Sequence, residues 1–206
     1  MWGLVQDNEI TKFINNPKSM VIGDVQYPSK IFQLWSTSEL EAIGIYEVVF
    51  NDTNKKDEQW YINTNQSFAF ADGTVTASYG SATAKAHADT TWSQDDEDDG
   101  DLPSDKSVGD IKTRGLKYNL IQTVKQQAAG ILANTDWYIT RNSEKSTAIP
   151  SAITTHRDLV RSRQATMETQ ITNASNTPAL ETLYTYTTND DGVQSRPLAE
   201  LPTLEI

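Results

Sequence analysis

The stretch from residue 132 to residue 161, LANTDWYITRNSEKSTAIPSAITTHRDLVR, decides the fold of this chain. It joins two runs with helical periodicity, which predict helices over residues 110–133 and 150–173. Pro150 opens the second run, and proline suits a first helical turn because its missing N–H would have no partner there. Two helices separated by so short a polar connection predict an antiparallel helical hairpin.

Each run carries its apolar residues on one helical face. In the first run they recur at steps of four and three, which is typical of a stripe that packs against a partner. That stripe is Leu116, Leu120, Val124, Ala128 and Ile131. In the second run they recur at steps of seven, seven and four, a narrower stripe that suits one partner helix or a trimer axis. The residues of this expected interface are Ile153, Val160, Met167 and Ile171.

The connection itself holds an aromatic residue among charges. Trp137 stands where the first helix should end, and we expect it to plug the open end of the hairpin beside Arg141 or Arg157. The alternative is an exposed Trp137 that binds a sugar ring. The charged residues favour ion pairs rather than a reactive site, since an arginine fork holds a carboxylate well. These residues are Asp136, Arg141, Glu144, Arg157 and Arg161.

The order of residues in this stretch resembles a segment of tail-associated and tail-fibre or fibre-assembly proteins of marine and cyanobacterial tailed bacteriophages. The shared frame is T-D-W, then Arg and Glu, then I-P, then R-x-x-x-R. Its residues here are Thr135, Asp136, Trp137, Arg141, Glu144, Ile149, Pro150, Arg157 and Arg161. The resemblance implies a role in a virion tail or in its assembly, and it implies no reaction.

A second stretch, YPSKIFQLWSTSELEAIGIYEV at 27–48, also resembles this family. The matching residues are Tyr27, Pro28, Ser36, Glu39, Leu40, Gly44 and Ile45. Ser36 and Glu39 have the spacing of a capping box, and Gly44 stands where a helix C-cap is expected. They predict one short helix over residues 37–43.

Residues 1–90 otherwise read as short strands of a small antiparallel β domain. Turn signals at 6–8 (QDN) and 71–73 (ADG) separate runs rich in aromatic and β-branched residues. Together with the helices this predicts an α+β fold.

Residues 91–109 are expected to form an acidic linker. Six of the seven residues from 95 to 101 are acidic, which is typical of a solvated, self-repelling segment. Asp95, Glu97 and Asp99 imitate the first half of a calcium-binding loop. Lys106 stands where that loop needs a bidentate glutamate, so a calcium site is not expected.

Residues 174–206 are expected to form an extended C-terminal arm. Pro178, Pro197 and Pro202 interrupt any helical pattern, and the apolar residues have no evident partner. Such an arm lies across an adjacent subunit or folds back on its own N-terminal sheet. In the first case its interface residues are Leu198, Leu201 and Leu204.

Composition limits the function. A formal charge of −11 argues against a nucleic-acid partner, and the absence of cysteine excludes thiolate metal sites. No apolar run is long enough for a membrane span. An apolar content of 37% favours a chain that completes its core against partners. His87 and His156 lie in no catalytic motif, so we expect no enzyme, no metal and no cofactor.

The sequence therefore predicts a structural protein of a bacteriophage virion, in the tail, baseplate or fibre-attachment region. It would be made in the host cytoplasm, form a homo-oligomer and pack against other virion proteins. One alternative is a tail-fibre assembly chaperone. The other is a receptor-binding module that reads host glycans with Trp and Tyr side chains.

Overall fold

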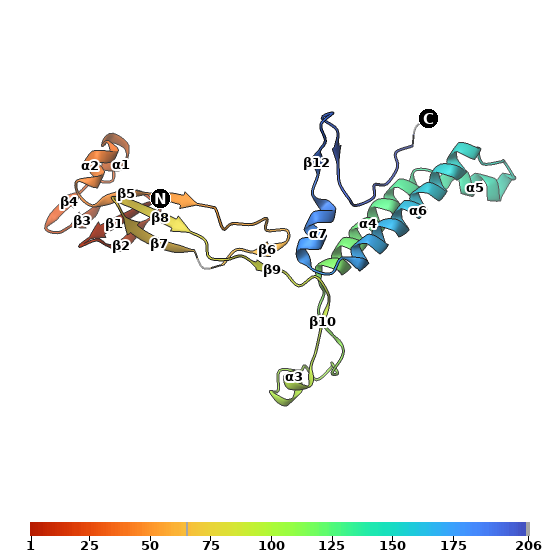
Figure 1. Ribbon diagram of the computed structural model, residues 1–206, viewed down its shortest axis with the longest axis horizontal. Coiled ribbons are helices and arrows are strands. Elements are labelled where there is room, and N and C mark those ends of the chain that lie inside the picture. Colours follow the sequence, from red (N-terminus) through yellow and green to blue (C-terminus); the bar gives the residue numbers. More distant parts are fainter. Residues whose placement is uncertain (65, 205–206) are drawn as a thin grey trace. The chain divides into compact units, whose positions relative to one another are not determined.

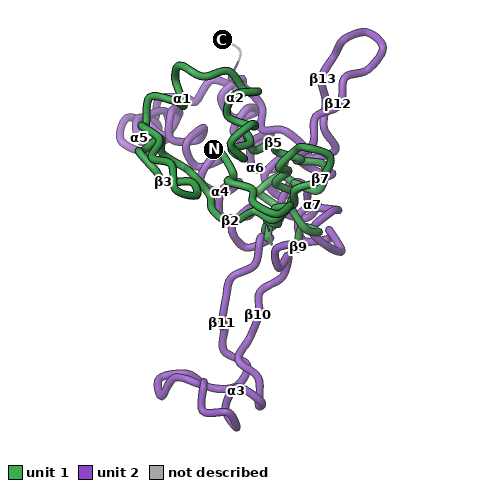
Figure 2. Tube along the Cα trace, turned by 90° about the vertical axis from the view of Figure 1, so that its left-hand side faces the viewer, with its two compact units in different colours: residues 1–83 green, residues 84–206 purple. Residues whose placement is uncertain are grey.

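The computed structural model describes residues 1–64 and 66–204. The chain divides into two compact units, Met1–Thr83 and Ala84–Ile206, which are coloured separately in Figure 2. The first unit holds the main sheet and two short helices, and the second holds the helical pair and the C-terminal stretch. The expected α+β fold is confirmed.

The first unit is built on a five-stranded sheet with the strand order β2-β1-β5-β8-β7. Its strands are β1 (Trp2–Gln6), β2 (Glu9–Ile14), β5 (Ile45–Asn51), β7 (Ser67–Ala71) and β8 (Thr74–Ser78). Neighbours pair antiparallel except β5 and β8, which run parallel. The parallel pair departs from the purely antiparallel sheet of the sequence-based expectation. Two further short strands are β6 (Tyr61–Ile62) and β9 (Thr83–Ala84).

Both expected hairpin turns are present. Asp7 and Asn8 have φ angles of 52° and 65°, and Asp72 and Gly73 have 49° and 72°. Two successive residues with positive φ form the turn type whose twist matches the flanking strands, and Asn, Asp and Gly tolerate it best. The turn residues in the sequence therefore fix the registers of β1–β2 and β7–β8.

The sheet buries apolar side chains on both faces, because successive strand residues point to opposite sides. One face carries Val5, Val48, Val75 and Ala77. Phe13 of β2 and Phe68 of β7 have ring centroids 4.4 Å apart, so the two edge strands curl toward each other.

The opposite face of the sheet is covered by β3 (Met20–Ile22), β4 (Val25–Tyr27), α1 (Ile31–Leu34) and α2 (Thr37–Glu41) (Figure 1). Its buried cluster is Leu4, Ile14, Met20, Ile31, Leu40 and Ile45. One helix was expected here and there are two, since the backbone also turns helically before Trp35.

The capping box at the start of α2 is confirmed. The Glu39 N–H donates to Ser36 Oγ at 3.3 Å, and the Ser36 N–H donates to Glu39 Oε2 at 2.7 Å. The Ser36 hydroxyl also donates to Glu39 Oε2 at 2.7 Å. The two bonds that this carboxylate accepts, first from the Ser36 N–H and then from its hydroxyl, hold the pKa of Glu39 below its usual value. Gly44 follows the helix with φ +81°, and a Cβ there would lie 2.5 Å from the Val5 carbonyl oxygen. Glycine is therefore required both by conformation and by space.

The second unit contains the expected antiparallel helical hairpin, formed by α4 (Leu116–Ala133) and α6 (Ser151–Asn173) (Figure 1). At one end Lys117 Nζ donates to the Thr172 carbonyl at 2.8 Å. Lys125 and Glu168 form an ion pair of 3.6 Å between the two helices.

The first helix begins at Leu116 rather than at residue 110. Gly115 is the N-cap residue of this helix and does not lie within it. Glycine is needed here because a Cβ would lie 2.3 Å from the Ala88 backbone. The residues before it form a strand.

Two longer helices were not expected, α5 (Asp136–Lys145) and α7 (Thr177–Tyr184). The first occupies most of the connection between α4 and α6. The second replaces the beginning of the expected arm. Asn176 caps α7 by accepting from the Ala179 N–H at 2.9 Å, and Pro178 lies in its first turn.

Residues 90–113, called the acidic hairpin below, correct the linker expectation. They lie within the second unit and are ordered by β10 (Thr90–Thr91), which pairs antiparallel with β11 (Ile111–Thr113). A short helix, α3 (Gln94–Asp98), forms the tip (Figures 1 and 2). Lys112 pairs with Asp96 and lies over the Trp92 ring at 4.4 Å.

The base of the acidic hairpin is closed by Asp89. Its carboxylate accepts from Arg114 Nη1 at 2.6 Å and from the Gly115 N–H at 2.8 Å. The Gly115 bond and then the Arg114 bond lower the pKa of Asp89. Lys112 thus pairs with one carboxylate of the acidic run, and the Arg114–Asp89 pair closes the base, so the segment is not a free linker.

The expected interface of α6 is also corrected. Its four residues are buried inside their own unit, so their surface is already covered: Ile153, Val160, Met167 and Ile171. The arm folds back on the helices of its own unit after a small hairpin of β12 (Thr187–Thr188) and β13 (Gln194–Ser195). Leu198 is buried, and Leu201 and Leu204 are half-buried.

Candidate functional site

Thr135 and Asp136, from the 132–161 stretch, meet Arg157 of α6 at the end of the helical hairpin. This arginine is only 8% exposed. Its Nη1 donates to the Leu132 carbonyl at 2.8 Å and to Thr135 Oγ1 at 2.6 Å, and it lies 2.9 Å from Asp136 Oδ1. Asp136 and Arg157, two of the charged residues expected to form ion pairs, therefore pair with each other.

This junction follows from how α4 ends. The last carbonyls of a helix lack partners within the helix and carry partial negative charge, so a cation is favoured beside them. Arg157 supplies that cation from the neighbouring helix. Thr135, itself 2% exposed, donates its hydroxyl to the Leu132 carbonyl at 3.0 Å while accepting from Arg157. The T-D pair and Arg157 thus form one bonded unit that fixes the connection between α4 and α5.

The expectation that Trp137 plugs the hairpin is wrong, because its side chain is 51% exposed. The end of the hairpin is already occupied by the Arg157 side chain and by Thr135. Of the two arginines expected beside it, Arg141 lies near the ring, with its guanidinium 4.8 Å from the Trp137 ring centroid. Tyr138 lies 3.7 Å away, centroid to centroid. The sugar-platform alternative requires an exposed ring, and Trp137 is half exposed while Arg141 and Tyr138 contact it.

Helix α5 as a whole buries none of its ten residues. An isolated helix of that length is marginal in water, so its ends must hold it. Asp136 ties its start to Arg157, and Ser146 ends it with φ 51°. Trp137 and Ile139 are both exposed on it, and since they are two residues apart on a helix they face different directions. A helix that offers aromatic and aliphatic side chains to solvent is typical of a protein-binding surface.

The remaining residues of the family-like segment have local roles. Pro150 is the N-cap residue of α6, and Glu144 is exposed on α5. Arg161 pairs with Asp158 of its own helix at 3.2 Å. The helix-cap residues Ser36 and Gly44 belong to the first unit.

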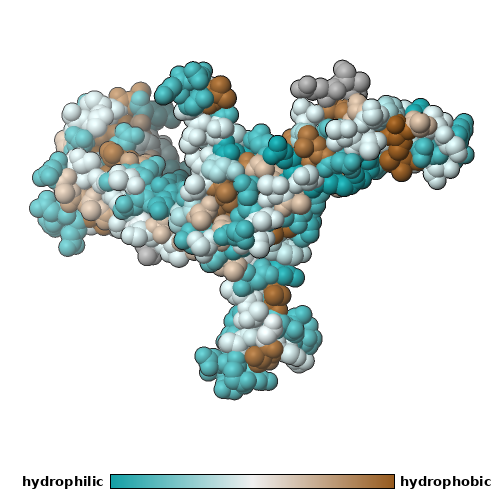
Figure 3. Space-filling model, turned by 45° about the vertical axis from the view of Figure 1, so that its right-hand side comes forward, coloured by the Kyte–Doolittle hydropathy of each residue, from teal (hydrophilic) through white to brown (hydrophobic). Residues whose placement is uncertain are grey.

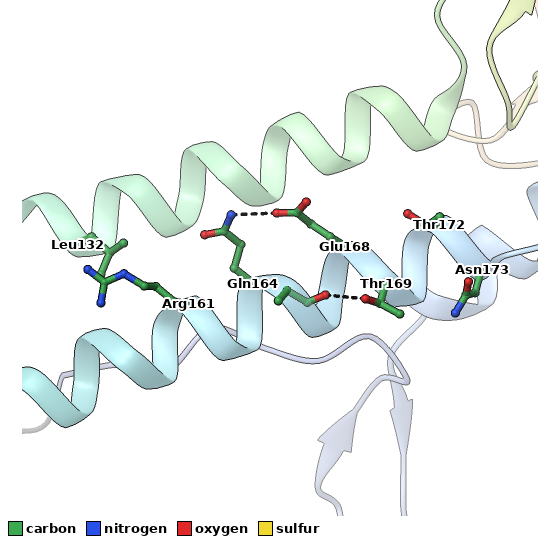
Figure 4. Close-up of a pocket in the computed structure, with 8 residues that line it drawn as sticks. Leu132, Arg161, Gln164, Glu168, Thr169, Thr172 and Asn173 are labelled. Atoms are coloured by element: carbon green, nitrogen blue, oxygen red, sulfur yellow. Dashed lines mark hydrogen bonds between the residues drawn. The ribbon is translucent and has the colours of Figure 1, made fainter.

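A groove that sequence reasoning did not anticipate runs along α6. It has a volume of about 720 Å³. Figure 4 shows Leu132 of α4 above side chains of α6 that line it. Gln164 donates to Glu168 at 2.8 Å, and Arg161 lies at one end. The groove is open, and most of its lining residues are polar and can offer hydrogen bonds.

Within residues 1–64 and 66–204, no group of three or more His, Cys, Asp or Glu side chains has the geometry of a metal site. In the same part of the chain, no helix is long and apolar enough to cross a membrane. Figure 3 shows small apolar areas scattered among polar ones on the face that it presents.

Comparison with known proteins gives no relative. No family model, no curated protein and no solved structure matches the chain.

Proposed function

We propose that this protein is a non-enzymatic component of a bacteriophage tail that acts by binding other tail proteins. In the first version of this proposal, the protein is a structural subunit of the tail, baseplate or fibre-attachment region. The observation that carries the proposal is the Arg157 junction. The residues that resemble phage tail proteins are used to fix α5 at the end of the hairpin, with Trp137 and Ile139 exposed.

The chemistry of the junction supports binding rather than turnover. The polar groups of Thr135, Asp136 and Arg157 are bonded to one another or to a helix end. A catalytic group needs free reach to a substrate, whereas these groups hold a helix in place. The exposed aromatic side chains of α5 are the kind enriched in protein interfaces.

A second candidate is a tail-fibre assembly chaperone. It is favoured by the burial of the apolar stripe of α6 and of Leu198 inside their own unit. A permanent structural subunit was expected to pack through these residues. With them covered, these residues are not available for a permanent interface, and contact through other surface residues suits a transient partner.

The test uses particles of the phage that encodes the chain. The protein is quantified by mass spectrometry in purified virions for the unaltered chain and for the double variant Trp137→Ser, Ile139→Ser. Leu159→Ser is the matched control, because Leu159 and Ile139 are both 42% exposed but lie on different helices.

A structural subunit appears in virions in many copies, and the double variant alone loses incorporation. A protein that is absent from virions but required for infectious fibres replaces the structural form with the chaperone form. If the double variant enters virions at the normal copy number, α5 is not the contact surface.

A further inference from the structure

The C-terminal arm, residues 196–204 (RPLAELPTL), is held by its own unit as a peptide is held in a binding groove. Leu198 is 1% exposed, and its N–H donates to the Leu183 carbonyl at 3.0 Å. Gln170 of α6 donates its Nε2 to the Pro197 carbonyl and accepts the Ala199 N–H at its Oε1, both at 2.9 Å. One side-chain amide thereby satisfies the backbone on both sides of Leu198.

This arrangement is that of an added strand. A neighbouring strand satisfies one residue's carbonyl and another's N–H in the same way, while the side chain between them enters a pocket. Gln170 and Leu183, together with the hole that Leu198 fills, are called the arm seat below. The seat binds backbone N–H and carbonyl groups and one apolar side chain. Its ligand class is therefore an extended peptide with a leucine at its centre.

Beyond Leu198 the arm follows a second hollow of about 280 Å³. The hollow is lined on one side by Leu201 and Leu204 and on the other by Ile131 and His156. Pro197 and Pro202 restrict the backbone to extended conformations. The arm thus meets the helices at two separated places without forming regular structure of its own.

The connection from α7 to the arm is weak. Strands β12 and β13 have two residues each, all of them exposed. Their turn is held by Asn189, whose side-chain oxygen accepts from the Val193 N–H at 2.8 Å. A two-stranded hairpin of this size, with no buried residue, is marginal in water. Opening it costs little, and the arm can then extend away from its own seat.

We infer that the arm exchanges between two copies of this chain, so that Leu198 of one copy fills the arm seat of the other. Every contact of Gln170 and Leu183 with the arm is the same whether the arm comes from the same chain or from a second one. The balance therefore depends on the opening of the β12–β13 hairpin and on the local concentration of copies. Exchange goes beyond the proposed function, and neither depends on the other.

The base of the arm carries a cluster that exchange also preserves. Arg196 lies 5.5 Å from the Tyr184 ring and 4.9 Å from the Tyr186 ring, and it pairs with Glu200 at 3.2 Å. The two tyrosines precede the hairpin turn, and Arg196 and Glu200 follow it. In an exchanged pair the tyrosines of one copy meet the arginine of the other.

The first experiment measures oligomeric state by size-exclusion chromatography with light scattering. Deletion of residues 190–192 shortens the turn so that the arm cannot fold back on its own copy. This deletion is expected to convert the full chain into a dimer. Adding Leu198→Ser to the deletion is expected to return it to a monomer, whereas adding Val193→Ser, an exposed control in the same connection, leaves it dimeric.

The second experiment tests the seat directly in the full chain carrying Leu198→Ser. A fluorescent peptide of residues 196–204 should bind saturably by anisotropy. Gln170→Ala in the chain, or Ser at the Leu198 position of the peptide, should weaken binding about tenfold or more, since the first removes two hydrogen bonds and the second a buried apolar side chain. Circular dichroism confirms that each variant is helical. If Leu198→Ser unfolds the chain, the peptide is added to the unaltered chain, where it must compete with the arm.

A deletion dimer that persists with Leu198→Ser overturns the exchange, and so does a deletion variant that stays monomeric. Peptide binding without any dimer shows that the seat takes a segment of another protein, and this also overturns exchange between copies.

Discussion

Replacing Arg157 by methionine tests the junction that holds the second unit together. The methionine keeps much of the apolar stem and removes the guanidinium. Two hydrogen bonds from a charged donor are lost, to the Leu132 carbonyl and to Thr135, and such bonds contribute about 1.5–3 kcal/mol each. The burial cost of the guanidinium disappears as well, which offsets part of the loss.

The other terms are small. Thr135 still donates to the Leu132 carbonyl, so that carbonyl is not left without a partner. Asp136 is 60% exposed, so its ion pair adds less than about 1 kcal/mol. The expected net loss is about 2–3 kcal/mol, measured by urea unfolding with a probe for the helical unit. For a unit of this size the melting temperature should fall by about 10 °C.

Two variants show where the energy lies. Arg163→Met, at an exposed position of the same helix, should change stability by less than about 0.5 kcal/mol. Asp136→Asn should cost less than about 1 kcal/mol. The reasoning is refuted if Arg157→Met costs under about 1 kcal/mol. It is also refuted if Asp136→Asn costs as much as Arg157→Met, because the ion pair and not the buried bonds would then hold the junction.

Four further measurements follow from the structure. Trp137→Ala should cost about 1 kcal/mol, the value of a half-exposed aromatic contact, and a loss above about 3 kcal/mol in chemical unfolding would mean that the ring is buried. Lys112 and then Ser93 hold the pKa of Asp96 at about 2, below its ordinary 3.8, so the stabilisation of the acidic hairpin is complete above pH 3.8 and is lost as the pH falls toward 2; NMR titration of this carboxyl checks it. Calorimetry with calcium should find no site in the acidic hairpin tighter than about 1 mM, and a stoichiometric micromolar site would contradict this. Gly44→Ala should destabilise the first unit by more than about 1 kcal/mol, and by clearly more than Gly23→Ala, where φ is also positive but nothing lies within 4 Å; equal thermal shifts would remove the role of crowding.

Local signals in the sequence predicted the elements that depend on local physics. The Asp-Asn and Asp-Gly pairs gave the hairpin turns, and Ser36 with Glu39 gave the start of α2, because turn and cap bonds join residues close in the chain. The periodic stripes gave the helical pair. The sequence also held a signal for α7, but Pro178 was interpreted as the end of any helical pattern. A proline two residues after an asparagine marks the start of a helix when the asparagine is the N-cap, as Asn176 is here.

Features that depend on distant residues could not be predicted in this way. The parallel pairing of β5 with β8 leaves no mark in either strand. The order of the acidic hairpin comes from Lys112 and Arg114, which lie outside the acidic run that suggested a linker. Gln170 carries no signal of its role, because its partners are backbone groups of the arm.

The candidate site was predicted in part. That Asp136 and Arg157 take part in ion pairs, and that an arginine lies near Trp137, follow from the sequence, whereas the assignment of each partner comes from the structure. The exposure of Trp137 does not follow from the sequence, because it depends on Arg157 filling the end of the hairpin first. A pattern that names the right residues therefore does not decide which of them is buried.

The Asp89 closure has a consequence for how this chain tolerates change. Because Asp89 bonds both Arg114 and Gly115, the two ends of the acidic hairpin are fastened together at its base, independently of what lies between them. Lengthening a loop whose ends are already joined costs little free energy, and exposed tips accept insertions best. The tip at α3 is therefore a natural place for sequence length to vary among related chains. It is also a place to graft an epitope or a fluorescent label without disturbing the helices.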